Sequence, residues 1–282
     1  MSKALSALLE SISLEPIDIN LFRGYPWLRG MDHLYGGEIM AQAMNAAYQT
    51  VASPLRMHSL HSYFLRPGEP SLPVIYEVDR IRDGRSFTTR RVVALQRGRA
   101  IFNVSMSFQL EEAGLEHGIA MPAVPGPEGL ISDRERYAAL LDKRPGEAYD
   151  WPVEFRQVDA MDPGKPEAKS PQTHVWFKAD GDLADDLTQH QEILAYASDT
   201  PALVTALRPH GLTQWSTGLR AASLDHCLWF HRPFRVDEWL LYALESPATG
   251  NGRGFVRGSI FSREGDLVAS VVQEGLVRQS RD

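Results

Sequence analysis

Histidines and a single cysteine offer the most versatile chemistry in this chain, and their spacing limits what they can do. His58 and His61 lie three positions apart, and His226 and His231 lie five apart. Neither pair has zinc-ligand spacing together with a supporting third ligand. The one cysteine, Cys227, can form neither an internal disulfide nor a structural zinc cluster. We therefore expect no metal site and a structural role for these histidines.

Two other local patterns resemble catalytic motifs without their context. Asp225 precedes His226, but adjacent residues of a strand point to opposite faces, so we expect no dyad. Ser223 lacks the Gly-x-Ser-x-Gly elbow of hydrolases that use a serine nucleophile, so we do not expect it to be a nucleophile. The pair Gly36 and Gly37 is too short to indicate a phosphate loop or a dinucleotide fingerprint.

Arginines form the densest basic stretch, at positions 80, 82, 85, 90, 91, 97 and 99. Arginine suits bidentate contacts with phosphate, although a solvated strand face explains the stretch equally well. The net charge of −7 argues against non-specific nucleic-acid binding and leaves a small anionic ligand possible. The sequence contains no apolar leader and no run of 18 apolar residues, so we expect a cytoplasmic protein that does not enter a membrane.

An internal repeat divides the chain. Residues 61–67 match residues 227–233 in the order aromatic, Phe, variable, Arg, Pro, at a separation of 166. The Gly-Arg pairs at 84–85 and 252–253 are 168 apart, and the turns at 96–98 and 263–265 are 167 apart. Three motifs in one order predict an ancient duplication.

Each half is predicted to contain a long helix and a set of strands. Segment 36–51 carries small and apolar residues at helical spacing and ends before Pro54, which indicates a buried helix. A second helix is predicted at about 185–209. Strands are predicted at 59–66, 74–82, 86–96 and 100–110, and at 153–158, 173–179, 222–231, 238–245, 254–262 and 267–278. The simplest assembly of each half is an antiparallel sheet wrapped around its helix.

The length of 282 residues suits two domains. Residues 111–150 differ in composition from both halves, with several prolines, many charges and a short helical pattern near 133–142. We therefore predict an N-terminal domain at 1–110, a linker at 111–150 and a C-terminal domain at 151–282.

Four segments together carry a family resemblance: His-Ser-Leu-His-Ser-Tyr-Phe-Leu-Arg-Pro-Gly at 58–68, Tyr-Ala-Ser-Asp at 196–199, Leu-Asp-His-Cys-Leu-Trp-Phe-His-Arg-Pro at 224–233 and Val-Gln-Glu-Gly at 272–275. In order and spacing they resemble the type II acyl-CoA thioesterases, which include bacterial thioesterase II and peroxisomal relatives. The resemblance implies an α+β double hotdog, two antiparallel sheets each wrapped around a long central helix. It also implies hydrolysis of acyl-CoA to a fatty acid and free CoA, without metal or cofactor, by a homodimer or homotetramer.

The resemblance further implies a catalytic set of Asp199, Ser223 and Gln273. Asp199 is the aspartate of the Ser-Asp motif, Ser223 stands two residues before Asp-His, and Gln273 belongs to Gln-Glu-Gly. A carboxylate can hold a water molecule in line and take its proton, while a hydroxyl and an amide orient that water. One departure from the family is Pro201, where we expect a bulkier residue.

Two further roles follow for an acyl-CoA substrate. The oxyanion needs donors, and backbone N–H groups of Gly36 and Gly37 at a helix start are candidates. Arg85, Arg90 and Arg91 are candidates for contacts with the phosphates of CoA.

Alternatives stay open from the residues alone. Asp199, followed by Thr200 and Pro201, could simply cap a helix that breaks and restarts. A hotdog hydratase or dehydratase would need a histidine facing the thioester and a carboxylate on the opposing helix, where only Glu38 stands at the very start. A non-catalytic acyl-CoA-binding protein would bind without turnover, and it would have no need of the complete Asp, Ser and Gln set.

Overall fold

The computed structural model describes residues 1–27, 32–141 and 151–279. Its helices are α1 (Lys3–Ile12), α2 (Gly36–Tyr48), α3 (Asp133–Leu141), α4 (Leu187–Leu207) and the 3₁₀ turn η1 (Arg208–His210). Its strands are β1 (Glu15–Asp18), β2 (Leu21–Gly24), β3 (Arg56–Phe64), β4 (Val74–Asp83), β5 (Phe87–Gln96), β6 (Arg99–Gln109), β7 (Val153–Gln157), β8 (Gln172–Ala179), β9 (Leu219–Ser223), β10 (Asp225–Phe230), β11 (Leu240–Gly250), β12 (Arg253–Phe261) and β13 (Leu267–Gln279). None of the described helices is long and apolar enough to cross a membrane.

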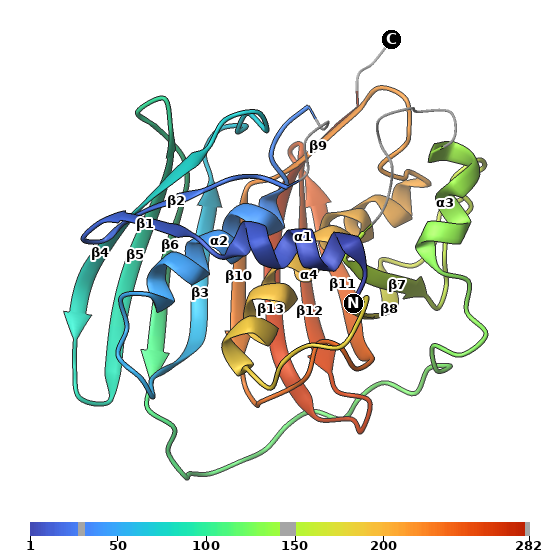
Figure 1. The fold of residues 1–282 in the computed structure, drawn as a ribbon. Coiled ribbons are helices and arrows are strands. Elements are labelled where there is room, and N and C mark those ends of the chain that lie inside the picture. The colour runs from blue at the N-terminus through green and yellow to red at the C-terminus, as the bar shows by residue number, and fades with distance from the viewer. Residues whose placement is uncertain (28–31, 142–150, 280–282) are drawn as a thin grey trace.

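The strands form one curved antiparallel sheet in the order β1-β2-β4-β5-β6-β3-β10-β13-β12-β11-β8-β7, and β9 pairs with the far end of β13 (Figure 1). The strands on the β3 side come from the first half and those on the β10 side from the second. The two sheets expected from the sequence therefore join edge to edge through β3 and β10.

The repeat explains this joint. Residues 61 and 227 occupy equivalent positions in the two halves, and in the structure His61 lies directly opposite Cys227 in the β3–β10 ladder. An approximate twofold axis therefore passes between these two residues. Each half covers the edge strand of the other, which removes two exposed sheet edges.

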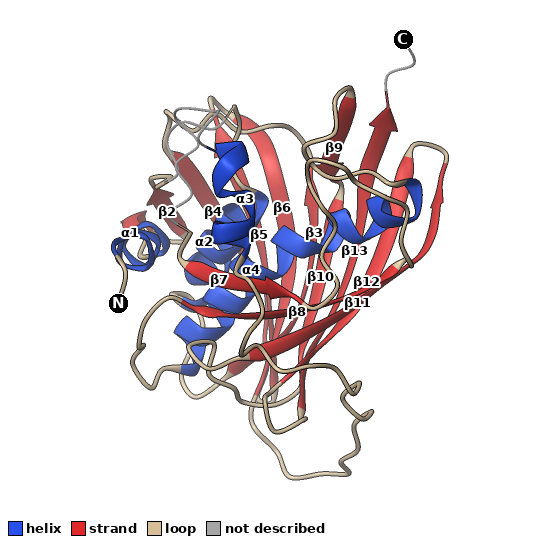
Figure 2. Cartoon of the chain, turned by 90° about the vertical axis from the view of Figure 1, so that its right-hand side faces the viewer, coloured by secondary structure: helices blue, strands red, loops and turns tan. Residues whose placement is uncertain are grey.

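The helices α2 and α4 lie side by side in the hollow of the sheet (Figures 1 and 2). Met40 and Met44 of α2 are fully buried, and α4 is buried along its middle turns. Small residues on α2, such as Ala41, Ala43 and Ala47, allow the helix to approach the sheet and α4 closely. Polar groups cross between the helices, for example from Nδ2 of Asn45 to Oε1 of Glu192 at 3.1 Å.

Most predicted elements have counterparts within a few residues, and the differences are local. The helix α1 and the strands β1 and β2 were not predicted. The predicted strand 222–231 is two strands, β9 and β10, that meet at Leu224. Within the predicted linker, α3 forms as expected, while residues 142–150 lie outside the described part of the chain. The domain boundaries stay a prediction.

Candidate active site

Asp199 lies in the interior of α4, the helix at the centre of the second half. The N-cap of this helix is Asp186, whose carboxylate accepts the backbone N–H of Thr188 at 3.0 Å. The helix continues through Pro201, which lacks the N–H that would bond to Ala197. The reading of Asp199 as a cap at a helix break is therefore wrong. Its side chain is instead 9% exposed, beside two polar residues of the sheet.

Ser223 and Gln273 reach Asp199 from the neighbouring strands. The Ser223 hydroxyl donates to Oδ1 of Asp199 at 3.0 Å. The Gln273 amide donates to the same oxygen at 3.0 Å and to the Ser223 oxygen at 2.7 Å. The three predicted residues thus form one closed hydrogen-bonded set, although they come from three separate elements.

The register of β9 and β13 produces this meeting. Ser223 lies opposite Gly275, two positions from Gln273 on β13, so both polar side chains face α4. A Cβ at Gly275 would overlap the side chain of Leu203, so the glycine lets α4 pack closely there. At Leu224 the chain passes from β9 to β10, and its backbone binds both Glu274 and Phe64. The Ser223 side chain is therefore held at the point where β3, β9 and β13 converge.

His226 lies behind Gln273 and was not predicted to take part. Its side chain is completely buried, with Nδ1 at 2.9 Å from Oε1 of Gln273 and Nε2 at 3.0 Å from the hydroxyl of Ser198. Burial lowers the pKa of His226, which favours the neutral imidazole. Because the Gln273 amide nitrogen donates to Asp199 and Ser223, its oxygen accepts from Nδ1–H. The histidine therefore fixes which way the glutamine amide points.

Asp225 faces away from this network, as expected from strand alternation. Its Oδ1 accepts the backbone N–H of Glu274 at 2.6 Å, and it makes no dyad with His226. The signal that could have identified His226 was its place on the buried face of β10 together with Leu228 and Phe230. A buried imidazole needs hydrogen-bonding partners, and here one of them is a site residue.

The start of α2 lies against the free side of Asp199. A Cβ at Gly36 would stand 2.7 Å from Oδ2 of Asp199 and 2.9 Å from the ring of Phe64. The first intrahelical bond of α2 comes from Ile39, so the N–H groups before it have no helical partner. Among the described residues, no hydrogen bond occupies Oδ2. Gly36 thus lies beside the carboxylate, whereas a Cβ at Gly37 would stand 2.3 Å from the Tyr196 carbonyl oxygen, so Gly37 packs against α4. The role of both glycines as donors to an oxyanion stays a prediction.

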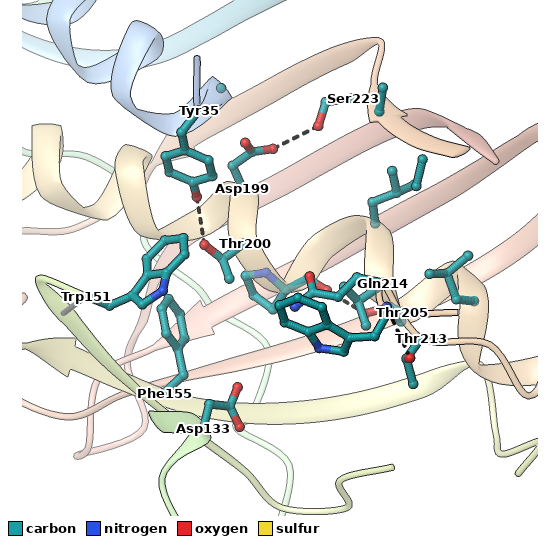
Figure 3. A pocket seen from close by; sticks show the side chains of 18 of the residues that line it. Tyr35, Asp133, Trp151, Phe155, Asp199, Thr200, Thr205, Thr213, Gln214 and Ser223 are labelled. Atoms are coloured by element: carbon teal, nitrogen blue, oxygen red, sulfur yellow. Dashed lines mark hydrogen bonds between the residues drawn. The ribbon is translucent and has the colours of Figure 1, made fainter. Parts of the chain in front are cut away.

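A cavity of about 1190 Å³ opens beside this set. Asp199, Ser223 and Gly36 line it, and Gln273 stands behind them. Figure 3 shows Asp199 and Ser223 on one side, aromatic side chains of Trp151 and Phe155 along the wall, and Asp133 across the cavity. The mostly apolar lining suits an acyl chain next to a polar reaction centre.

The three arginines predicted to contact phosphate lie away from this cavity. None of Arg85, Arg90 and Arg91 belongs to its described lining. Arg90 is 1% exposed and donates to the Thr50 side chain at 2.9 Å and to the Thr50 carbonyl at 3.0 Å, besides pairing with Asp83. These contacts occupy its guanidinium, and a phosphate contact would have to break them. For the exposed Arg85 and Arg91 the role stays a prediction.

Comparison with solved structures defines the fold class. A protein of unknown function with a hot dog fold from Alicyclobacillus acidocaldarius superposes with a TM-score of 0.78, covering 98% of this chain and 99% of that one. The two share 18% sequence identity, so this likeness concerns the fold alone. The continuous sheet with two central helices is accordingly a double hotdog, as the resemblance implied.

Sequence comparison then identifies the family. The model "Acyl-CoA thioesterase" matches residues 144–276, and the model "Acyl-CoA thioesterase N-terminal domain" matches residues 25–109. Mouse acyl-coenzyme A thioesterase 8 is 40% identical, covering 97% of this chain and 89% of that protein. The crystal structure of the acyl-CoA thioesterase II TesB2 from Mycobacterium marinum is 39% identical with a TM-score of 0.81, covering 97% of this chain and 98% of that one. The chain belongs to the acyl-CoA thioesterase family, and the predicted family is confirmed.

Proposed function

We propose that this protein hydrolyses acyl-CoA thioesters by direct attack of a water molecule that Asp199 activates. The proposal rests on the different surroundings of the two oxygens of the Asp199 carboxylate. Its Oδ1 is held by Ser223 and Gln273, while Oδ2 lies beside Gly36 at the start of α2, and both Asp199 and Gly36 line the cavity. A carboxylate fixed through one oxygen presents the other to a water in a defined direction.

The reaction then balances without a covalent enzyme intermediate. The water oxygen bonds to the thioester carbon as its proton passes to Asp199. The carbonyl oxygen becomes an oxyanion, for which N–H groups at Gly36 and Gly37 are the proposed donors. Collapse of the tetrahedral intermediate breaks the C–S bond, and the proton returns to the departing sulfur. The products are the free acid and CoA with its thiol restored.

The alternatives receive less support from the geometry. A hydratase would use a carboxylate of α2, the central helix of the first half. Its Glu38 is buried outside the described cavity lining, and it accepts from the Ser11 hydroxyl at 2.6 Å and the Trp27 N–H at 2.8 Å. A pure acyl-CoA-binding protein has no use for a carboxylate oriented by two partners. The homodimer or homotetramer and the cytoplasmic location stay predictions.

The test is thiol release from a panel of acyl-CoA thioesters, short to long. Asp199→Asn keeps the shape of the side chain but cannot take a proton, so we expect a folded protein with kcat lowered by about a hundredfold or more. Asp225→Asn makes the same change on the opposite face of the sheet and should keep nearly full activity. Equal turnover by wild type and Asp199→Asn would show that Asp199 is not the base. Tight binding without thiol release by the wild type would favour the binding protein.

A further inference from the structure

The cavity contains few cations that could meet the phosphates of a CoA ester. The arginines in its described lining are Arg66, Arg134, Arg208 and Arg220. Arg208 is 2% exposed and bound to Asp159 at 2.8 Å. Arg134 lies 3.7 Å from Asp180 and donates to the Trp151 carbonyl. Arg66 and Arg220 are exposed, and the described residues provide no ion pair to either of them.

The internal repeat gives Arg66 a direct comparison. Its equivalent in the second half, Arg232, is held by Asp266 at 3.0 Å and by Glu116 at 3.2 Å. Among the described residues, the only partner of the Arg66 guanidinium is the Ala100 carbonyl, to which it donates at 2.7 Å. The same structural position thus carries a neutralised arginine in the second half and an unneutralised one, beside the cavity, in the first half. If both arginines served only to end a strand, there would be no reason for Arg232 to have acidic partners and Arg66 to have none among the described residues.

Arg220 lies in an unusual cross-strand pair. Its partner in the β9–β13 register is Arg278, and directly opposed residues share one face of a sheet. Both are exposed, and the described residues place no carboxylate in an ion pair with either. Opposed like charges destabilise a strand pair, whereas an anion bound between them would turn the repulsion into attraction.

Arg66 and Arg220 flank a gap in the sheet. Beyond the bond between Phe64 and Leu224, the chain after β3 turns towards β6, since both Leu65 and Arg66 donate to the Ile101 carbonyl. β9 continues along β13 instead. The two segments therefore diverge, and the arginine that each of them carries belongs to the described lining of the cavity.

We propose that Arg66 and Arg220 bind the diphosphate of the CoA moiety and so fix the direction of the substrate in the cavity. The proposal rests on the thioesterase function proposed above. Arg220 lies three positions before Ser223 on β9, or about 10 Å along the strand, and the arginine side chain adds to this reach. In CoA, about twelve bonds separate the sulfur from the diphosphate, as in about four extended residues, or about 14 Å. A thioester held at Asp199 therefore leaves the diphosphate within reach of Arg220, which lines the same cavity.

The opposite part of the cavity offers the phosphates no cation that lacks an acidic partner among the described residues. Asp133, Glu154 and Asp180 belong to the lining there, and Asp133 lies across the cavity from Asp199 (Figure 3). These carboxylates pair with Arg136, Arg156 and Arg134, respectively. The acyl group consequently extends along Trp151 and Phe155, and the nucleotide leaves through the gap beside β9.

Two substrates that differ only in the nucleotide test this assignment. We would measure kcat/KM for an acyl-CoA and for the same acyl group on N-acetylcysteamine, which has no phosphate. Arg66→Ala and Arg220→Ala should each lower kcat/KM for the CoA ester by about tenfold or more, mainly through KM, and leave the short thioester within about twofold. Arg66→Lys and Arg220→Lys should recover part of the loss, because a lysine keeps the charge without the bidentate geometry. Arg232→Ala, at the equivalent position of the other half, is the matched control and should change neither substrate.

Equal losses on both thioesters, or no loss on the CoA ester, would overturn the proposal. If the wild type hydrolyses neither thioester, the thioesterase function fails instead. The role of the two arginines can then still be tested by measuring ligand affinity with calorimetric titration. The proposal requires that the Arg66→Ala, Arg220→Ala double variant binds CoA more weakly than the wild type does. Binding of pantetheine should be unchanged, and a result in which both ligands weaken alike would contradict it.

Discussion

Replacement of His226 separates positioning from proton transfer in this site. In the wild type its Nδ1–H binds Oε1 of Gln273 at 2.9 Å and thereby turns the amide nitrogen towards Asp199 and Ser223. In His226→Leu the Gln273 oxygen loses this donor, so the amide can turn over and present its oxygen to the carboxylate. A hydrogen bond to a charged group contributes about 1.5–3 kcal/mol, and about 1.4 kcal/mol corresponds to a tenfold change. We expect kcat to fall by about 10- to 100-fold.

His226→Asn is the informative companion variant. Its side-chain amide can donate from near the position of Nδ1, so the orientation of Gln273 survives while the contact with Ser198 is lost. We expect kcat within a fewfold of wild type, with a free energy of unfolding lower by about 1 kcal/mol. Since burial lowers the pKa of His226 and keeps it neutral, the pH dependence of kcat should be the same in this variant.

The assay is steady-state thiol release across pH, with thermal unfolding measured on the same preparations. Wild-type kcat in His226→Leu would refute the positioning argument. A large loss of kcat in His226→Asn, with a limb of the pH profile missing from the residual activity, would make His226 the base in place of Asp199. Loss of stability alone, with both kcat values intact, would leave the histidine a structural role.

Two further perturbations test neighbouring features. Gly36→Ala places a Cβ 2.7 Å from Oδ2 of Asp199, which must displace the carboxylate, so kcat should fall by about a hundredfold. The control is Gly118→Ala, whose Cβ would have its nearest neighbour at 3.8 Å and which should have no effect in the same assay. Burial raises the pKa of Glu192 to about 8, so the folded state retains a proton that the unfolded state loses above its ordinary value of 4.5. The free energy of unfolding of the wild type should therefore fall between about pH 5 and pH 8, by up to about 1.4 kcal/mol per pH unit, and Glu192→Gln should remove this decline in chemical denaturation experiments. Parallel pH profiles of the two proteins would show that Glu192 ionises normally.

The sequence predicts the central elements of this fold because each is long and strongly patterned. The two buried helices and the strands of each meander follow directly from apolar periodicity and turn residues. The strands β1 and β2 escape prediction because four residues each are too few to establish a period. The helix α1 does carry a usable signal, since Leu5, Leu8 and Ile12 share one face and Ser2 caps the Leu5 N–H at 3.1 Å.

The site was harder to predict from physical principles alone. Asp199 and Ser223 are 24 residues apart, and Ser223 and Gln273 are 50 apart, so their meeting depends on sheet register rather than on local spacing. The family resemblance supplied these residues. The break at Leu224 has no glycine or proline to mark it, because it arises from a change of strand partner. His226 was correctly placed on the face opposite Asp225. Its partner, Gln273, could not be predicted without the register of β10 and β13.

The two halves of the duplication differ at the position of Gln273. His61 lies opposite Ser105 on β6, and Cys227 lies opposite Val272 on β13, so the position equivalent to Gln273 in the first half is Met106. A methionine cannot donate to a carboxylate, and Met106 is 1% exposed within the core. The first half instead contributes the start of α2 at Gly36, which contacts Asp199 across the approximate twofold axis. The two halves have therefore diverged into complementary parts, and neither half alone contains both the oriented carboxylate and the helix start that faces it.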